Sequence, residues 1–161
     1  MTLYLDGWLF WRPKTQDGIT FYNTAYWYEH GTSILIRSTD GIHWEKIATI
    51  YQGGRNDETE IEFLSDGRML ATARLEYGEK RTSLFEVRED GLAYLTDLPS
   101  AGDTSYVGLI VDGDIAYATY YTSRVDRDYP WILGMLSPSS VVLAKLELPA
   151  LEALADKTAA R

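Results

Sequence analysis

Three residues of this chain, Glu58, Arg74 and Tyr106, are spaced so that they could share one site. Glu58 opens a stretch of alternating residues that predicts a strand, the chain turns at an Asp-Gly pair, and Arg74 lies near the end of the returning strand. Both side chains are therefore expected at one rim of a sheet. A carboxylate beside a tyrosine hydroxyl can accept its proton, which turns a phenol of pKa about 10 into a nucleophile. The alternatives are a cross-strand ion pair for Glu58 and Arg74 and a packing role for Tyr106.

Further candidates flank these three residues. Asp57 and Asp103 lie in the segments leading into the same predicted strands, and their location makes them the candidates for a general acid. Arg12 opens an earlier strand near the same rim. Trp27, Tyr28 and His30 end a returning strand and could line the same site, where aromatic rings could stack on the face of a sugar.

The strands that would position these residues follow a regular series of turns. Asp-Gly is a strong hairpin signal, because type I′ turns need positive φ at both central residues. From residue 17 on, such pairs begin at Asp17, Asp40, Asp66, Asp90 and Asp112, so that every second pair is 46 to 50 residues apart. Four-stranded blades of β-propellers repeat at ~40–50 residues. The spacing therefore predicts an all-β protein made of propeller blades.

We expect a single partial β-propeller domain of about three four-stranded antiparallel blades, at 8–54, 57–100 and 104–148. A short C-terminal helix is predicted over 149–158, with a proline in its first turn. Residues 124–138 form a long insertion in the third blade, and loops of this length are often functional. An open antiparallel sandwich with the same hairpins is the alternative.

Two segments resemble a known family. Residues 38–44 (STDGIHW) fit the pattern S-x-D-G-x-x-W and resemble the Asp-box of sialidases and related BNR-repeat propellers, where the motif has a structural role. Residues 58–74 (ETEIEFLSDGRMLATAR) are similar to the sialidase segment E-x-x-I-x-x-L-x-D-G-x-L-x-x-x-A-R. Residues 102–109 (GDTSYVGL) resemble the sialidase strand that carries the nucleophilic tyrosine. A clan of five-bladed glycosidases acting on plant or fructan sugars shares S-x-D-x-x-x-W segments.

The resemblance implies roles for four of the candidates. Tyr106 would be the nucleophile and Glu58 its base, while Arg74 would hold the carboxylate of a sialic acid. Residues 11–13 (WRP) resemble the R-I-P element, which implies the same role for Arg12. Only 31 residues separate Arg74 from Tyr106, and no family-like motif in that stretch supplies the third arginine of the family.

Composition narrows the partners. The net charge of −9 disfavours nucleic acid and anionic membranes, which need basic patches. There is no cysteine, the two histidines are isolated, and nucleotide-binding glycine motifs are absent, so we expect no metal and no cofactor. No apolar stretch approaches ~20 residues, and the N-terminus does not resemble a signal peptide. These features predict a cytoplasmic protein.

Three functions remain open. The first is a sialidase-like glycoside hydrolase, or a remnant of one, that binds an acidic or neutral glycan at the mouth of the propeller. The second is a non-catalytic module that binds a glycan or a protein at the same rim, and the third is a truncated fragment of a longer propeller. Because known propellers have ~4–8 blades, a homodimer completing six blades is a further expectation.

Overall fold

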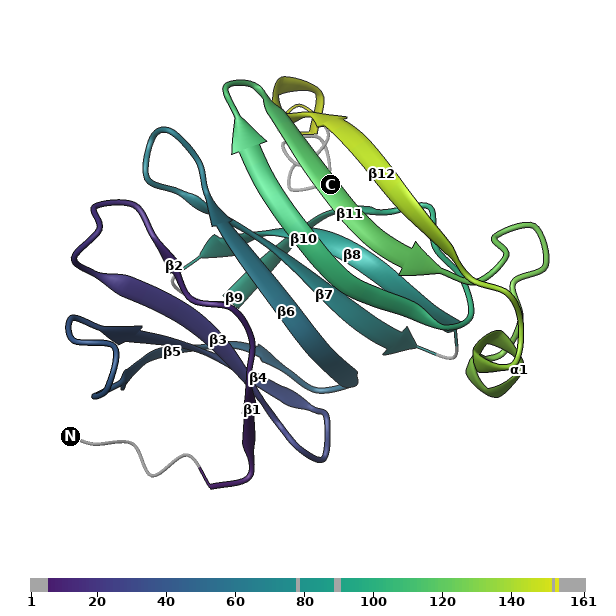
Figure 1. Cartoon of the computed structure of the whole chain (residues 1–161), viewed down its shortest axis with the longest axis horizontal. Coiled ribbons are helices and arrows are strands. Elements are labelled where there is room, and N and C mark those ends of the chain that lie inside the picture. The colour runs from purple at the N-terminus through teal and green to yellow at the C-terminus, as the bar shows by residue number, and fades with distance from the viewer. Residues whose placement is uncertain (1–5, 78, 89–90, 152, 154–161) are drawn as a thin grey trace.

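The computed structural model of the chain describes residues 6–77, 79–88, 91–151 and 153. Its strands form three antiparallel sheets that follow one another along the sequence, and this confirms the prediction of an all-β protein. The sheets lie beside one another, with β6 of the second sheet between β3 of the first and β10 of the third (Figure 1). The predicted blade count and propeller axis stay a prediction.

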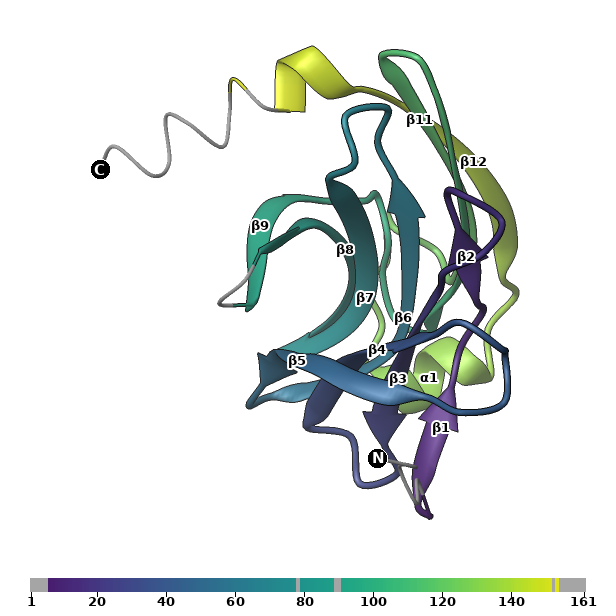
Figure 2. The same cartoon turned by 90° about the vertical axis from the view of Figure 1, so that its left-hand side faces the viewer.

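The first sheet contains β1 (Trp8–Phe10), β2 (Lys14–Thr15), β3 (Phe21–Trp27), β4 (Thr32–Ser38) and β5 (Glu45–Gln52). The second contains β6 (Arg55–Phe63), β7 (Met69–Tyr77), β8 (Glu79–Arg88) and β9 (Gly91–Asp97). The third contains β10 (Thr104–Asp112), β11 (Ile115–Thr122) and β12 (Ser140–Glu147), and helix α1 (Trp131–Met135) lies in the insertion before β12. In Figure 2, β9 lies at the left of the second sheet, and β11 and β12 of the third sheet lie at its right.

The prediction of four strands in every sheet was wrong for two of the three. The first sheet has five strands because β1 and β2 both pair with the same edge of β3, and Pro13 between them has no N–H to donate to that edge. The third sheet has three strands, because the chain turns helical at residue 148 directly after β12. Residues 148–151 and 153 are helical, while 152 and 154–158 of the predicted helix lie outside the described residues.

Two layers of the core lie one on each face of the second sheet, and a smaller cluster of Ala25, Ile34 and Ile36 lies within the first sheet. Adjacent residues of β7 serve opposite layers, as the two-residue period of a strand requires: Leu70 packs toward the third sheet and Ala71 toward the first. The layer shared with the third sheet includes Leu84, Leu98, Val107, Leu109, Ala116, Ala118 and Tyr120. The layer shared with the first sheet includes Leu35, Ile50, Ile61, Ala73 and Phe85.

The Asp-Gly pairs at Asp17 and Asp40 do mark hairpin turns, but these two turns are not type I′. Gly18 and Gly41 both have φ 72°, whereas Asp17 and Asp40 do not have positive φ. Each aspartate instead accepts hydrogen bonds from the backbone beyond it, and Asp40 Oδ1 accepts from the N–H groups two and three residues on at 2.8 and 2.7 Å. The same bonds, at 2.8 and 2.7 Å, hold the pKa of Asp17 at about 2. These are turns closed by a side chain.

No helix within the described part of the chain is long and apolar enough to cross a membrane.

Candidate functional site

Two β-bulges present the predicted catalytic residues Glu58 and Tyr106. The register between β6 and β7 shifts between Asp57 and Glu60, and the register between β10 and β11 shifts between Ser105 and Gly108. Glu58 has φ 50° and Tyr106 has φ 53°, in the left-handed region that costs a residue other than glycine about 1–3 kcal/mol. Bulges re-aim side chains and are common beside active sites. Neighbouring strands thus carry the same distortion near the same end.

Arg74 is the centre of a buried group of charges, which we call the Arg74 cluster: Arg74, Asp57, Glu58 and Asp103. Arg74 Nε and Nη2 donate to the two carboxylate oxygens of Asp57 at 2.7 and 2.6 Å. Its Nη2 lies 3.6 Å from Glu58 Oε1 and its Nη1 lies 3.7 Å from Asp103 Oδ1. Burial alone would lower the pKa of Arg74, but the hydrogen bonds to Asp57 raise it well above its ordinary value. The structure therefore places four predicted site residues together.

Glu58 is the least satisfied member of the Arg74 cluster. Its side chain is 8% exposed, and its Oε2 is buried without a hydrogen-bond partner. Burial raises the pKa of Glu58, the charge of Arg74 opposes that shift, and the carboxylates of Asp57 and Asp103 add to it. A buried carboxyl group with a raised pKa can hold a proton and donate it, which is the task of a general acid.

Asp103 is held in place by the insertion at 124–138. Trp131 of α1 donates from Nε1 to Asp103 Oδ1 at 3.0 Å, and Lys80 Nζ lies 4.1 Å from the centroid of the Trp131 ring. Gly134 of α1 lies so close to the Asp103 backbone that a Cβ at residue 134 would be 2.4 Å from the Asp103 nitrogen. Ser123 Oγ donates to the Gly134 carbonyl at 3.0 Å. The insertion is therefore a support for one carboxylate of the cluster.

Replacing Trp131 by Phe tests this support. The ring can stay on Lys80, but the hydrogen bond to a charged group is lost, and we expect the free energy of unfolding to fall by about 1–2 kcal/mol. Urea denaturation measures the change. The matched control is Trp44→Phe, which removes an indole N–H bonded to the Gly41 carbonyl at 3.2 Å in an exposed turn. Equal losses in the two variants would show that Trp131 does not hold Asp103.

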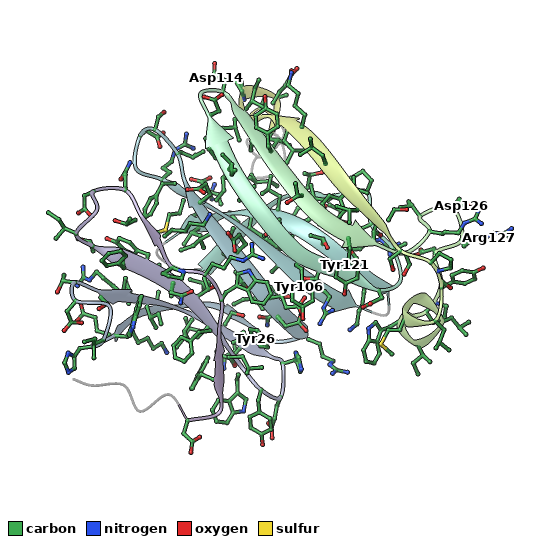
Figure 3. The ribbon with its side chains drawn as sticks, in the orientation of Figure 1. Tyr26, Tyr106, Asp114, Tyr121, Asp126 and Arg127 are labelled. Carbon is green, nitrogen blue, oxygen red and sulfur yellow. The ribbon has the colours of Figure 1, made fainter. Side chains whose placement is uncertain are left out.

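An aromatic shelf, made of Trp11, Tyr106 and Tyr121, lies beside the Arg74 cluster. The rings of Trp11 and Tyr106 are 5.4 Å apart between centroids, and those of Tyr106 and Tyr121 are 5.8 Å apart. Figure 3 shows Tyr26, Tyr106 and Tyr121 following one another from β3 to β11. Burial and the carboxylate of Asp57 raise the pKa of Tyr26 to about 12. Burial and Asp103 likewise raise the pKa of Tyr121.

The predicted pairing of Tyr106 with Glu58 is not formed in this structure. No hydrogen bond joins the two among the described residues, since Glu58 Oε2 has no partner and Tyr106 is 57% exposed. The bulge turns the Tyr106 ring outward onto Trp11 and Tyr121. The nucleophilic role of Tyr106 stays a prediction. The prediction did not include Tyr26 and Tyr121, whose pKa values are raised by burial and by the neighbouring carboxylates of Asp57 and Asp103.

The remaining predicted substrate-binding residues lie outside the Arg74 cluster. Arg12 donates from Nη1 to the Val107 carbonyl at 2.9 Å, and its guanidinium lies 5.4 Å from the centroid of the Trp11 ring. Trp27 packs on Trp8, with 5.4 Å between ring centroids, because it points to the opposite face of β3 from Tyr26.

The ring of Tyr28 packs on Trp27, and its hydroxyl donates to Glu29 Oε1 at 3.0 Å. The expectation that Trp27 and Tyr28 line the site with Arg74 is therefore wrong in this structure. His30, in the turn after β3, does reach it, because its Nδ1 is 2.8 Å from Asp57 Oδ2, although the two are not aligned for a hydrogen bond. Among the described residues, no group of three or more His, Asp or Glu side chains is arranged to hold a metal ion.

Comparison with known proteins gives a likeness in fold. No family model matches the sequence, and no curated protein matches it. One solved structure that the fold resembles is an endo-1,4-β-xylanase from Bacteroides thetaiotaomicron VPI-5482, with a TM-score of 0.53 and 13% sequence identity. The match covers 86% of this chain and 50% of that one, so the chain spans half the length of this neighbour. At this identity the likeness shows the fold alone.

Proposed function

We propose that the protein binds a neutral glycan at the Arg74 cluster and hydrolyses its glycosidic bond. The observation that carries the proposal is Glu58: a buried carboxyl with a raised pKa, on a strained backbone, with one oxygen lacking a partner. Strain and perturbed pKa values concentrate at functional sites. The aromatic shelf beside it offers ring faces for sugar C–H groups, and the fold neighbour is described as an endo-1,4-β-xylanase.

Glycoside hydrolysis generally uses two carboxyl groups, one protonated and one ionised. In our proposal Glu58 donates a proton to the oxygen of the leaving group, because its pKa is raised. Asp103, which accepts a hydrogen bond from Trp131 Nε1 and lies 3.7 Å from Arg74, is the second carboxylate. Asp57 uses both oxygens to hold Arg74, which gives it an orienting role.

The charge of the cluster favours a neutral sugar over a sialic acid. The family resemblance implies that Arg74 holds a substrate carboxylate, but two of its nitrogens already donate to Asp57. One guanidinium faces three carboxyl groups, from Asp57, Glu58 and Asp103. An added carboxylate would meet repulsion from these groups, whereas sugar hydroxyls can donate to them.

We also propose that the three sheets are blades of a β-propeller. The support is the order of the sheets along the chain, each an antiparallel meander whose neighbours pack on its faces, with β3, β6 and β10 adjacent. The bulges in β6 and β10 then bring Glu58 and Tyr106 to one mouth. The number of blades in the assembled protein belongs to this proposal and is open to measurement by solution mass.

A panel of nitrophenyl glycosides tests the function. The panel contains neutral xylosides, arabinosides and glucosides together with a sialoside, and release of nitrophenol is the readout. We expect turnover of at least one neutral glycoside and none of the sialoside. Titration calorimetry with the same sugars separates a hydrolase from the non-catalytic alternative, which would bind sugar without releasing nitrophenol. The absence of both binding and turnover for every sugar would overturn the proposal.

A further inference from the structure

A second polar site lies next to the aromatic shelf. A cavity of about 360 Å³ opens between β2, β6 and the third sheet, lined by Arg12, Lys14, Glu60, Ile110, Tyr117 and Leu143. Its walls combine apolar and aromatic side chains with a few charged groups, which is typical of small-molecule sites. Of the residues that line this cavity, the sequence prediction included Arg12, and the proposed hydrolysis uses none of them.

Glu60 places a buried carboxylate with an unused hydrogen-bond acceptor in the wall of this cavity. Its side chain is 1% exposed, and its Oε2 has no hydrogen-bond partner although Arg12 Nη1 lies 3.6 Å away. Lys14 Nζ is 3.1 Å from the other oxygen, Oε1. Burial raises the pKa of Glu60, and the hydrogen bond from Lys14 opposes that shift. A buried acceptor without a partner is costly, and a ligand hydroxyl in the cavity would satisfy it.

The charges around the cavity are balanced. Lys14 also binds Glu62 at 2.8 Å and the Leu109 carbonyl at 3.2 Å, so its three donors are engaged. Within the described part of the chain, the hydrogen bond that Arg12 donates comes from its Nη1, and its side chain is 49% exposed. Two cations and two carboxylates together suit an uncharged ligand with several hydroxyls. A strongly charged ligand would disturb pairs that are already formed.

The cavity continues the surface of the Arg74 cluster along one face of the third sheet. Tyr121, Thr119 and Tyr117 alternate on β11 and so share a face, and Tyr117 lies opposite Ile110 in the register. The spacing along a strand is ~3.3 Å per residue, so the shelf and the cavity wall are separated by roughly 13 Å. Gly108 lies between them without a side chain, and a Cβ there would come within 2.8 Å of Thr119 Oγ1.

We infer that this cavity is a second subsite for the same glycan, so that the substrate class is a neutral oligosaccharide and not a single sugar. One end of the chain would lie at Glu58, the middle on Trp11 and Tyr106, and the other end in the cavity with a hydroxyl donating to Glu60. This inference rests on the proposed function of the Arg74 cluster. The cavity is where the remainder of the ligand would bind.

The test measures affinity against chain length. Calorimetry with β-1,4-linked xylose oligomers of one to six units is expected to show an affinity that rises by at least about tenfold over the series. Tyr117→Ala, which removes a cavity wall, is expected to abolish that rise while leaving the affinity for the shortest sugar within about twofold of wild type. Leu143→Ala repeats the test at a side chain that is 65% exposed and therefore buries little apolar surface in the core. Tyr94→Ala, at a 51% exposed tyrosine of β9, is the matched control and should keep the rise.

Four results would overturn the inference. Affinity that is independent of length, or a rise that survives in both cavity variants, would leave the proposed function intact and remove the second subsite. A dimer in sedimentation whose formation is lost in Leu143→Ala would show that a second copy covers this face instead. Absence of binding at every length, together with an inactive glycoside panel, would remove the proposed function itself.

Discussion

Replacing Arg74 by Met is expected to lower the free energy of unfolding by about 3–5 kcal/mol, because it leaves buried carboxylates without their cation. The Arg74 side chain is 11% exposed and that of Asp57 is 7% exposed. Asp57 would lose both of its charge-assisted hydrogen bonds, and Glu58 and Asp103 would lose the positive charge near them. Urea denaturation at pH 7 measures the loss, which should shrink as the pH falls and the carboxylates are protonated.

Arg37→Met is the matched control for this experiment. Arg37 of β4 also pairs with a cross-strand carboxylate, Glu45, but the two side chains are 45% and 56% exposed. Exposed pairs contribute little, so this variant should lose well under half as much stability. If the two substitutions cost the same, the Arg74 cluster is not a buried network and its proposed electrostatics are wrong.

The strands and turns could be predicted because their signals are local. Alternating residues and Asp-Gly pairs placed the hairpins, although the aspartates close the turns with their side chains and not with the backbone of a type I′ turn. The number of strands in each sheet could not be predicted in the same way. It depends on how the segment around Pro13 divides one edge of β3, and on the helical turn after β12, and both are decided by packing.

The site was predictable in so far as its members belong to one hairpin. Asp57 and Arg74 are opposite each other in the register of β6 and β7, so sequence spacing was enough to bring them together. Tyr26 comes from another sheet and carries no local signal, whereas the position of His30 at the end of a predicted returning strand did indicate it. Tyr121, like Tyr26, has no such signal, because a turn with Asp112 and Gly113 at its centre would pair Tyr106 with Thr119. The structure instead turns at Gly113 and Asp114, and Gly108 pairs with Thr119.

Bulges are what the sequence pattern does not show. A strand pattern fixes which face each residue occupies only while the register is continuous. At Tyr106 the positive φ rotates the ring out of the expected position beside Glu58. The prediction therefore placed Glu58 and Tyr106 on neighbouring strands, but the hydrogen bond that it expected between them is not formed in this structure.

Glu58→Gln is expected to reduce turnover of the preferred neutral glycoside by about 10²–10⁴-fold, because it removes the proton donor while keeping its shape. The same change should make the fold more stable at pH 7. Burial raises the pKa of Glu58 in the folded protein above its ordinary 4.5. The folded state then holds its proton more tightly than the unfolded chain, so wild type loses stability as the pH rises through the raised pKa. Glutamine does not titrate and avoids that loss.

The stability difference between Glu58→Gln and wild type should accordingly be small below pH 4.5 and grow toward neutral pH. Denaturation series at several pH values measure it, and Glu45→Gln at the exposed end of β5 is the control, with unchanged turnover. Loss of activity with a gain in stability is the pattern of a residue kept for function, since a buried unpaired carboxylate is costly to the fold. If Glu58→Gln kept full turnover, or lost stability at neutral pH, Glu58 would be a structural partner of Arg74 and the acid would have to lie elsewhere.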